Sequence, residues 1–563
     1  MLSSSRLASL LFLTMLSSAC QQKKEEPSRP DPAWNESRSA PETVNSDPDP
    51  TLSEWETEVF ASATGLQLKE IKDFLRAKIT TPPAGTCHPL SGFLMNSLPA
   101  GEAFHVQRAS NIEGKPMDLS EALQDLRGKF SNDKATMAEI KVVKVDLSGE
   151  TATTALNVQI ADSRLQINAR WTAQWTKDDP PALLDLKVTS HEECLRGTGG
   201  SLADSTGAVL ASFEEKTQVV HGMDHWVGRI ETLLGIEIGG WHGLAAADIN
   251  NDGLDDIYLC DGGGLPNRLF VQQQDGTVID RSRESGLGLL DHSFGSLFAD
   301  FDNDGDQDAA IAMASGVLIL ENDGTGTFSP VTAKSFPSAV PYSLAAADYD
   351  EDGDLDLFAS CYVQRAGANR HSFVARPLPY HDATNGGRNE LLRNEGSLRF
   401  RNVTKEAGLH PGNSKFSYSA SWEDYDQDGD MDLYVANDFG GNNLYRNALR
   451  ESGKSTFTDV AAEAGVRDVA AGMSACWGDF DNNGLADLYV GNMFSSAGNR
   501  IAFQEKFKSG GNAETRALYQ RHARGNSLFQ NLGQGRFKDV SVSSGTTMGR
   551  WAWSSLFADL DNN

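Results

Sequence analysis

A nine-residue acidic loop constrains this chain more than any other feature: Asp300-Phe301-Asp302-Asn303-Asp304-Gly305-Asp306-Gln307-Asp308. Carboxylates stand at positions 1, 3, 5 and 9, and the alternation directs them towards one point. A glycine at position 6 permits the sharp turn that this convergence needs. Carboxylates packed so closely repel one another unless a hard cation coordinates them. The spacing therefore predicts a cation-binding loop.

The same loop occurs four more times, which argues against an ordinary Asx-Gly turn. A sixth copy begins at Asp559 and Asp561, and the sequence stops inside it at Asn563, so we expect the chain to be truncated there. The predicted ligands, loop by loop, are Asp248, Asn250, Asp252 and Asp256; Asp300, Asp302, Asp304 and Asp308; Asp348, Asp350, Asp352 and Asp356; Asp424, Asp426, Asp428 and Asp432; and Asp479, Asp481, Asn483 and Asp487.

The residues after each loop restrict the kind of cation site. An EF-hand needs Glu at loop position 12, and a dockerin-like calcium loop also needs an acid there. Ligands made only of oxygen favour Ca²⁺, or Mg²⁺, over zinc or copper, and we expect Ca²⁺. Position 12 is apolar in all five copies, which excludes the EF-hand and dockerin-like loops: Leu259, Ile311, Ala359, Val435 and Val490.

The N-terminal segment, residues 1–20, has the pattern of an export signal. Arg6 precedes a short apolar run, and small residues precede Cys20. The segment resembles a bacterial lipoprotein signal with Cys20 as the lipidated residue, which implies a place in the bacterial cell envelope, at the outer membrane or cell surface. Secretion after cleavage near Ala19 is the alternative. The apolar run is too short to span a bilayer.

Composition changes then divide the chain before the repeats. Residues 21–50 are rich in Pro, Ser, Asp and Glu and predict a disordered linker. Residues 51–194 show helical patterns followed by strand patterns, which indicates a small α+β domain. This domain resembles the cone-shaped folds of the nuclear-transport-factor type. In an exported domain we expect a Cys87–Cys194 disulfide, and residues 195–240 form a connector.

The repeat region, residues 241–563, predicts a mainly β fold. The loops begin 52, 48, 76, 55 and 80 residues apart, a period of about fifty with insertions. Each unit reads as four short strands, with the acidic loop between the first and second. Such units bury their apolar faces by radial packing, as the four-stranded blades of a β-propeller do. A linear array of independent modules fits less well, because the strands are apolar on both faces.

Several motifs resemble those of a known family. Ser293-Phe294-Gly295 leads into the Asp300 loop, as in the FG-GAP/VCBS repeats of integrin α-chain propellers. Asn-x-Leu followed by a Phe-containing strand and Glu-Ala-Gly, over 389–409 and 442–466, is similar to cartilage-acidic-protein-like (ASPIC/UnbV) proteins. The resemblance implies a calcium-bound propeller at or outside the cell surface that serves adhesion or complex formation, without a defined enzymatic activity.

Two insertions, about 364–389 and 493–526, fall between second and third strands, at the end of the blades opposite the acidic loops. Both are basic and aromatic, although the whole chain has a formal charge of −29. They are either solvated loops that balance an acidic surface or a recognition surface for a protein or glycan; we do not expect nucleic acid. The candidate partner-binding residues are Arg370, His371, Tyr380, His381, Arg516, Tyr519, Arg521 and His522.

Two functions follow from this organisation. The first is a non-enzymatic, exported protein whose calcium-rigidified propeller binds a partner. The alternative is a secreted polysaccharide lyase or hydrolase that uses His371, His381 or His522 with nearby Arg or Tyr. The sequence contains no nucleophile motif or phosphate loop, so no catalytic residue is assigned.

Overall fold

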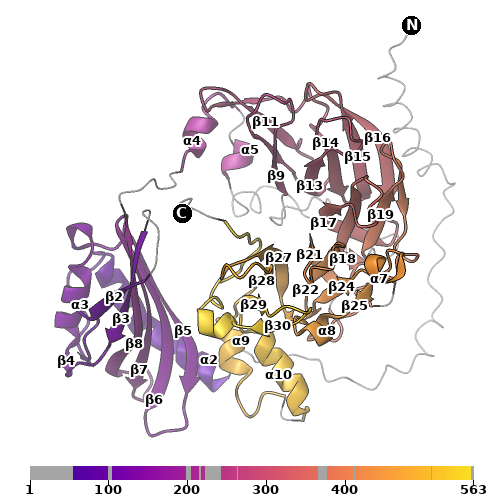
Figure 1. Ribbon diagram of the computed structural model, residues 1–563. Helices are drawn as coiled ribbons and strands as arrows, with labels where there is room; N and C mark the ends of the chain where they lie inside the picture. The colour runs from indigo at the N-terminus through magenta and orange to yellow at the C-terminus, as the bar shows by residue number, and fades with distance from the viewer. Residues whose placement is uncertain are drawn as a thin grey trace, which may run out of the picture. The chain divides into compact units, whose positions relative to one another are not determined.

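The computed structural model describes residues 55–98, 104–197, 204–214, 217–221, 243–262, 264–364, 377–410, 412–508 and 510–558 (Figure 1). The predicted signal, Cys20, the linker, much of the connector and the sixth acidic loop lie outside these residues. Within the described ranges, no helix is both long enough and apolar enough to cross a bilayer.

An antiparallel six-stranded sheet and two helices make up the α+β region. Its strand order is β2-β3-β8-β7-β6-β5, and a small second sheet pairs β1 with β4. The elements are β1 Thr86–Cys87, β2 Leu94–Ser97, β3 Phe104–Asn111, β4 Met117–Asp118, β5 Met137–Asp146, β6 Ala152–Ala161, β7 Leu165–Trp175, β8 Leu183–Arg196, α2 Glu56–Leu75, α3 Leu119–Arg127 and the 3₁₀ turn η3 Ser131–Asp133.

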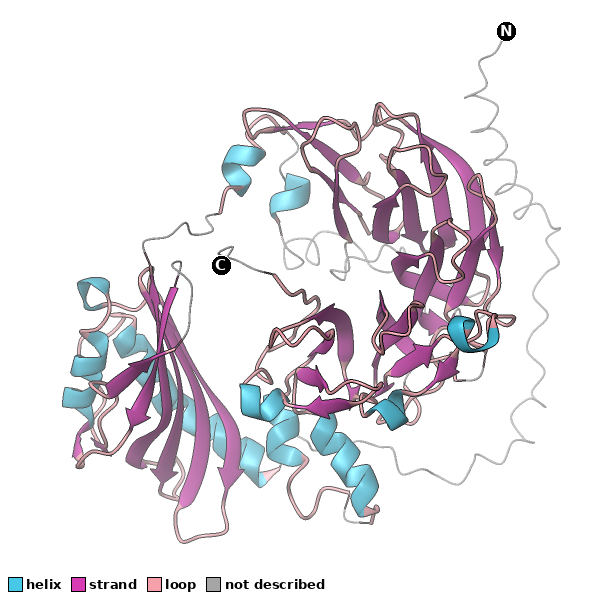
Figure 2. Cartoon of the chain, in the orientation of Figure 1, coloured by secondary structure: helices cyan, strands magenta, loops and turns pink. Residues whose placement is uncertain are grey.

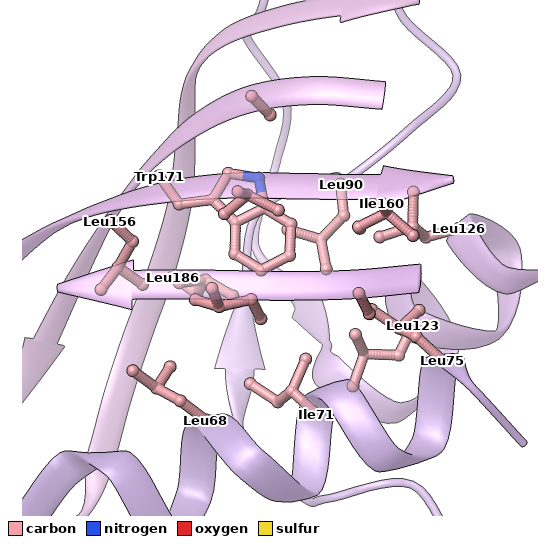
Figure 3. Packing of buried hydrophobic residues seen from close by; sticks show 14 of the residues in the cluster. Leu68, Ile71, Leu75, Leu90, Leu123, Leu126, Leu156, Ile160, Trp171 and Leu186 are labelled. Atoms are coloured by element: carbon pink, nitrogen blue, oxygen red, sulfur yellow. The ribbon is translucent and has the colours of Figure 1, made fainter. Parts of the chain in front are cut away.

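The core of this region lies between the helices and one face of the sheet. Burial alternates residue by residue along β6 and β7, because successive side chains of a strand point to opposite faces. Leu68 and Ile71 of α2 pack towards Leu156, Trp171 and other side chains of the sheet (Figure 3).

The first helix, α2, is continuous over twenty residues. Gly65 lies within it, but Thr64, Leu68 and Ile71 form one continuous buried face, so packing offsets the low helix propensity of glycine. The disulfide prediction was wrong, since Cys87 and Cys194 are both free thiols. The next residue, His88, donates its backbone N–H to Leu186 O (2.7 Å), eight residues from Cys194 along the extended strand β8.

Five four-stranded antiparallel sheets, here called blades 1 to 5, follow in sequence order. Figure 2 shows their strands in magenta. Their strands are β9 Leu244–Ala247, β10 Asp256–Leu259, β11 Arg268–Gln272 and β12 Val278–Asp280; β13 Ser293–Ala299, β14 Asp308–Met313, β15 Gly316–Asn322 and β16 Phe328–Ser335; β17 Ala339–Ala347, β18 Asp356–Gln364, β19 Glu390–Asn394 and β20 Phe400–Asn402; β21 Phe416–Glu423, β22 Asp432–Asp438, β24 Asn443–Arg446 and β25 Thr458–Asp459; and β27 Gly472–Gly478, β28 Asp487–Asn492, β29 Ser527–Asn531 and β30 Phe537–Asp539.

Shorter elements lie around the blades. β23 pairs with β26 across the junction between blades 4 and 5. Their bounds, with those of the short helices, are β23 Gly440–Gly441, β26 Val469–Ala470, α4 Thr206–Val209, α5 Thr217–Val220, α7 Leu449–Ser452, α8 Ala461–Ala464, α9 Ser496–Ile501, α10 Ala513–His522 and α11 Ser541–Ser544.

Neighbouring blades share their hydrophobic cores. One cluster joins blade 1 to blade 2 through Tyr258 and Ile311, and the next joins blade 2 to blade 3 through Phe301 and Leu357. Two further clusters join blades 3 and 4 and blades 4 and 5. The first strands β9, β13, β17, β21 and β27 also contact one another in order. The mainly β, propeller-like fold preceded by a small α+β region is confirmed.

Topology places the acidic loops and the insertions at opposite ends of the blades. Every acidic loop connects a first strand to a second strand, as between β13 and β14. The insertions connect second to third strands, β18 to β19 and β28 to β29. Because strands in a blade are antiparallel, these two kinds of connection leave the sheet at opposite edges.

Candidate metal centres

The aspartate at position 1 fixes the turn of each acidic loop. In blade 2, Asp300 accepts a hydrogen bond at Oδ1 from Asp304 N (3.1 Å) and at Oδ2 from Gly305 N (3.0 Å). Equivalent pairs of bonds form in the other four loops, at Asp248, Asp348, Asp424 and Asp479. Gly305 has φ of 98°, a conformation that favours glycine and explains its place in the motif.

The aspartate at position 9 holds each loop to its own sheet. It is the first residue of the second strand and is buried in every blade. In blade 2, Asp308 accepts at Oδ2 from Phe301 N (3.1 Å) and at Oδ1 from Asn322 N (2.9 Å) at the end of the third strand. Both donors are backbone N–H groups, so the fold itself positions this carboxylate beneath the loop.

In four of the five loops, three carboxylates present ligand atoms that all lie within 4.8 Å of one another. In blade 2 these come from positions 1, 3 and 5; in blades 3, 4 and 5 they come from positions 1, 3 and 9. In the blade 1 loop, Asn250 stands at position 3, where the four triads have an aspartate. Its Nδ2 donates to Asp252 Oδ2 (3.1 Å). The triads are Asp300, Asp302 and Asp304; Asp348, Asp350 and Asp356; Asp424, Asp426 and Asp432; and Asp479, Asp481 and Asp487.

Burial and mutual repulsion make these carboxylates hard to ionise without a cation. Burial, with neighbouring loop carboxylates adding to it, raises the pKa of Asp308 to about 7, of Asp356 to about 8 and of Asp432 to about 9. The same causes raise the pKa of Asp426 to about 6. A cation in the loop would stabilise the ionised form of each of these carboxylates.

The donor set fits a hard divalent cation. Among the predicted ligands, four oxygens are buried and have no hydrogen-bond partner: Asp302 Oδ1, Asp350 Oδ1, Asp426 Oδ1 and Asp432 Oδ2. Buried polar atoms are normally paired, so these oxygens are suited to be metal ligands. Carboxylate oxygen is also the donor that hard cations prefer. The acidic clusters could hold a metal ion.

Loop position 7 was not among the predicted ligands. In blades 2 and 4, the aspartate at this position belongs to the candidate site. Asp306 and Asp430 are 7% and 2% exposed, and each has a buried Oδ1 without a hydrogen-bond partner. Burial and loop carboxylates raise the pKa of both. The sequence signal was an acid at position 7 in three copies, weakened by Leu254 and Leu485 in the other two.

The two insertions meet through four of the candidate partner-binding residues. Tyr380 stacks in parallel on Tyr519 with ring centroids 6.0 Å apart, and it lies 5.2 Å from the ring of His522. His381 lies 5.3 Å from Tyr519. We call these four residues the insertion cluster. Arg370 and His371 lie outside the described residues.

The two remaining arginines make contacts within the protein. Arg516 donates from Nε and Nη2 to Phe507 O, within the second insertion. Arg521 forms an ion pair of 2.7 Å with the fully buried Asp468 and approaches Asp539 at 3.5 Å. The Nη2 group of Arg521 is therefore engaged inside the propeller, whereas its buried Nη1 has no hydrogen-bond partner.

His522 is expected to make folding sensitive to acid. Burial of its ring lowers its pKa to about 4, whereas an unfolded histidine has a pKa of about 6.5. As pH falls between these values, the unfolded state takes up a proton that the folded state does not. The free energy of unfolding should therefore fall by about 1.4 kcal/mol per pH unit across this window.

Urea unfolding of the wild type and of His522→Phe, measured from pH 7 down to pH 4, isolates this effect (~1.4 kcal/mol per pH unit). Phenylalanine keeps the ring contacts with Phe439 and Tyr380 and removes the titration. The difference in stability between the two proteins should change with pH as calculated. A constant difference would contradict the assignment.

Sheets of four short strands that share cores with their neighbours, each with an acidic loop at one end, define a propeller-type repeat protein. The sequence comparison then identifies the repeats: the FG-GAP-like repeat model matches residues 248–311, 300–359 and 424–490. These segments of the chain are FG-GAP-like repeats.

Similar proteins include cartilage acidic protein 1. The Xenopus tropicalis protein is 31% identical over 144 residues, and the Homo sapiens protein is 29% identical over 144 residues. Each match covers 24% of this chain and 22% of the relative. A solved Agrocybe aegerita lectin, described as recognising non-reducing terminal N-acetylglucosamine, aligns with a TM-score of 0.31 and 13% identity over 82% of this chain and 93% of that chain. This similarity is too weak to indicate the function of this chain.

Proposed function

We propose that the acidic loops bind Ca²⁺ and that bound Ca²⁺ rigidifies the propeller. The observation that carries the proposal is the convergence of three carboxylates within 4.8 Å in four separate loops. Loops of this kind outside the cell typically bind with dissociation constants of about 10⁻⁴ to 10⁻³ M. Ca²⁺ accepts more ligands and looser geometry than Mg²⁺, which suits triads drawn from different loop positions. Calorimetric titration of the metal-free full chain with CaCl₂ tests the proposal.

This protein would act outside the cytoplasm as a non-enzymatic adhesion or partner-binding module. The sequence pattern of residues 1–20 supports export, with lipid attachment at Cys20 and a place at the bacterial outer membrane or cell surface. Secretion without a lipid is the alternative. Millimolar free calcium is available outside cells, which matches the affinity expected for the loops.

The partner, a protein or a glycan, would bind at the end of the blades that carries the insertions. Tyr380 in the insertion cluster is 44% exposed, and Lys508 lies 4.7 Å from the ring of Tyr519. Exposed aromatic rings beside a positive charge suit a sugar face or an anionic group. Loops carried on a rigid scaffold are also common binding elements.

Replacing Tyr380 and Tyr519 together with alanine should weaken partner binding at least tenfold, the loss typical of removing binding hot spots worth about 2 kcal/mol. Binding would be measured on immobilised glycan and protein arrays, with calcium and with chelator. Leu532→Ala is the matched control, because Leu532 is exposed but follows the third strand of blade 5, at the acidic-loop end. Equal binding by both variants would argue against this surface.

A carbohydrate-active enzyme on the same scaffold is the second candidate, favoured by one observation. His381 and His522 come from different insertions and contact the same tyrosine pair. Burial lowers the pKa of both, so both imidazoles are neutral near pH 7. Release of unsaturated or reducing sugar ends from array glycans would identify this activity, and binding without product would support the non-enzymatic function.

A further inference from the structure

One asparagine stands at the same place in four blades, at the end of the third strand. Each is buried, and its backbone N–H is held by the position 9 aspartate of its own blade at 2.6 to 2.9 Å. We call these residues the inter-blade asparagines: Asn322, Asn394, Asn447 and Asn531.

The side chain of each inter-blade asparagine reaches the acidic loop of the preceding blade. Asn394 donates from Nδ2 to Phe301 O (2.7 Å), the position 2 carbonyl of the blade 2 loop. Asn322, Asn447 and Asn531 make the same bond to position 2 carbonyls at 2.8 to 2.9 Å. Position 2 lies between the first two ligand positions, so this bond orients the peptide that joins them.

Position 2 is also tied to its own loop. The backbone N–H of Phe301 donates to Asp308 Oδ2 (3.1 Å), and Tyr349 makes the equivalent bond to Asp356 (3.4 Å). A continuous series of hydrogen bonds therefore runs from the position 9 aspartate of one loop, through an inter-blade asparagine, to position 2 and the position 9 aspartate of the preceding loop. In blade 4 the series is interrupted, because Asp432 Oδ2 has no hydrogen-bond partner.

A second set of contacts joins the same neighbours directly. Asn303 of the blade 2 loop donates to Gly353 O (3.1 Å) and Asp354 Oδ1 (2.9 Å) of the blade 3 loop. Gln427 of the blade 4 loop donates to Gly484 O (3.0 Å) of the blade 5 loop. The donors occupy position 4, between the ligands at positions 3 and 5, so the geometry around one cation site depends on the conformation of the next.

We propose that the inter-blade asparagines are positioning residues that make cation binding cooperative between neighbouring loops. The inference rests on the proposed calcium function and adds to it how the loops act together. A cation that draws position 9 of one loop into place fixes the asparagine, which then fixes position 2 of the preceding loop. Because the two sites share these hydrogen bonds, cation binding at one site changes the affinity of the other. That change in affinity is a coupling free energy between the sites.

The chain provides a matched pair of variants to test this. Asn394 is the last residue of the short strand β19 and Asn389 directly precedes that strand, and both are buried. Asn389 also donates two hydrogen bonds towards blade 4, to Asn413 Oδ1 (2.9 Å) and Ser417 Oγ (2.9 Å). Those bonds lie at the opposite end of the strand from the acidic loops. Both alanine variants lose buried inter-blade hydrogen bonds, but only Asn394→Ala breaks a connection between loops.

The experiment is a calorimetric titration of the full chain with CaCl₂ after removal of metal. Wild type should bind with a Hill coefficient above unity, and Asn394→Ala should lower that coefficient and weaken binding about fivefold or more. Asn389→Ala should lower the melting temperature and leave the isotherm unchanged. Non-cooperative wild-type binding, or identical isotherms for the two variants, would overturn the coupling but not the calcium function. No heat from wild type would overturn both.

A second variant keeps the test decisive if Asn394→Ala does not fold. Asp350→Ala removes one ligand from the blade 3 loop at a partly exposed side chain. Coupled loops predict the loss of that site and about fivefold weaker binding at a neighbouring one. Loss of a single site with all others unchanged would overturn the proposal.

Discussion

Removing divalent cations should lower the free energy of unfolding of the propeller by about 7 kcal/mol. Each loop contributes about 1.4 kcal/mol when free Ca²⁺ is tenfold above its dissociation constant, and there are five loops. A loss of this size is comparable to the whole stability of many domains, about 5 to 15 kcal/mol. Loss of the cation also leaves Asp356, Asp432 and their neighbours buried beside one another without compensation.

Thermal unfolding in excess chelator, followed by addition of calcium, measures this effect. The melting temperature should fall in chelator and recover when Ca²⁺ exceeds the chelator. Magnesium at the same concentration is the control and should restore less, because it demands near-octahedral geometry. The loops with Asn250 and Asn483 carry fewer carboxylates and should release calcium first. An unchanged melting temperature would contradict the calcium function.

Replacing Arg521 with alanine should destabilise the protein by about 3 kcal/mol or more, because it leaves a buried carboxylate without its ion-pair partner. Asp468 is fully buried, and Arg521 lies 2.7 Å from it. Asn492 also donates to Asp468 Oδ2 (3.0 Å), so the carboxylate connects α10 to the end of blade 5. The side chain of Arg521 is 20% exposed, which leaves little of it for an outside partner.

Urea unfolding of Arg521→Ala beside Arg446→Ala distinguishes a structural role from a recognition role. Arg446 forms an exposed pair with Glu451 at 3.7 Å, and such pairs contribute about 0 to 1 kcal/mol. If Arg521→Ala is as stable as Arg446→Ala but loses partner binding, Arg521 serves recognition. A large loss of stability would show that its main role is to hold the second insertion in place.

Repetition is what allowed the fold to be predicted from the sequence. One acidic loop is ambiguous, but five copies, each entering an apolar segment, indicate blades, and the strand order then follows. The convergence of carboxylates at positions 1, 3 and 9 in blades 3, 4 and 5 was also predictable, because alternation and glycine determine where those side chains point. The residues of position 12, such as Ile311 and Val435, are buried in second strands, as their apolar character indicated.

What the sequence did not reveal depends on contacts between distant segments. The Cys87–Cys194 pairing failed because β1 meets β8 near Leu186, eight residues before Cys194, and local patterns do not specify that register. Position 7 was missed because its burial comes from neighbouring segments: Asp430 accepts a hydrogen bond at Oδ2 from Arg450 N (3.0 Å), beyond the third strand. The inter-blade asparagines were not singled out in the sequence, because the Asn-x-Leu pattern marks the start of the third strand, at Asn389 and Asn442, and not its end.

The buried residue at position 2 has a consequence for how such a protein can change. Phe301 and Tyr349 pack between blades, while the aspartates on either side of them face the cation site. A change in loop length would disturb the core and the ligands at once. The β18–β19 and β28–β29 connections, by contrast, already accommodate long additional segments. Foreign peptides should therefore be tolerated when grafted at these two connections and rejected at the acidic ones, giving the scaffold one invariant rim and one adaptable rim.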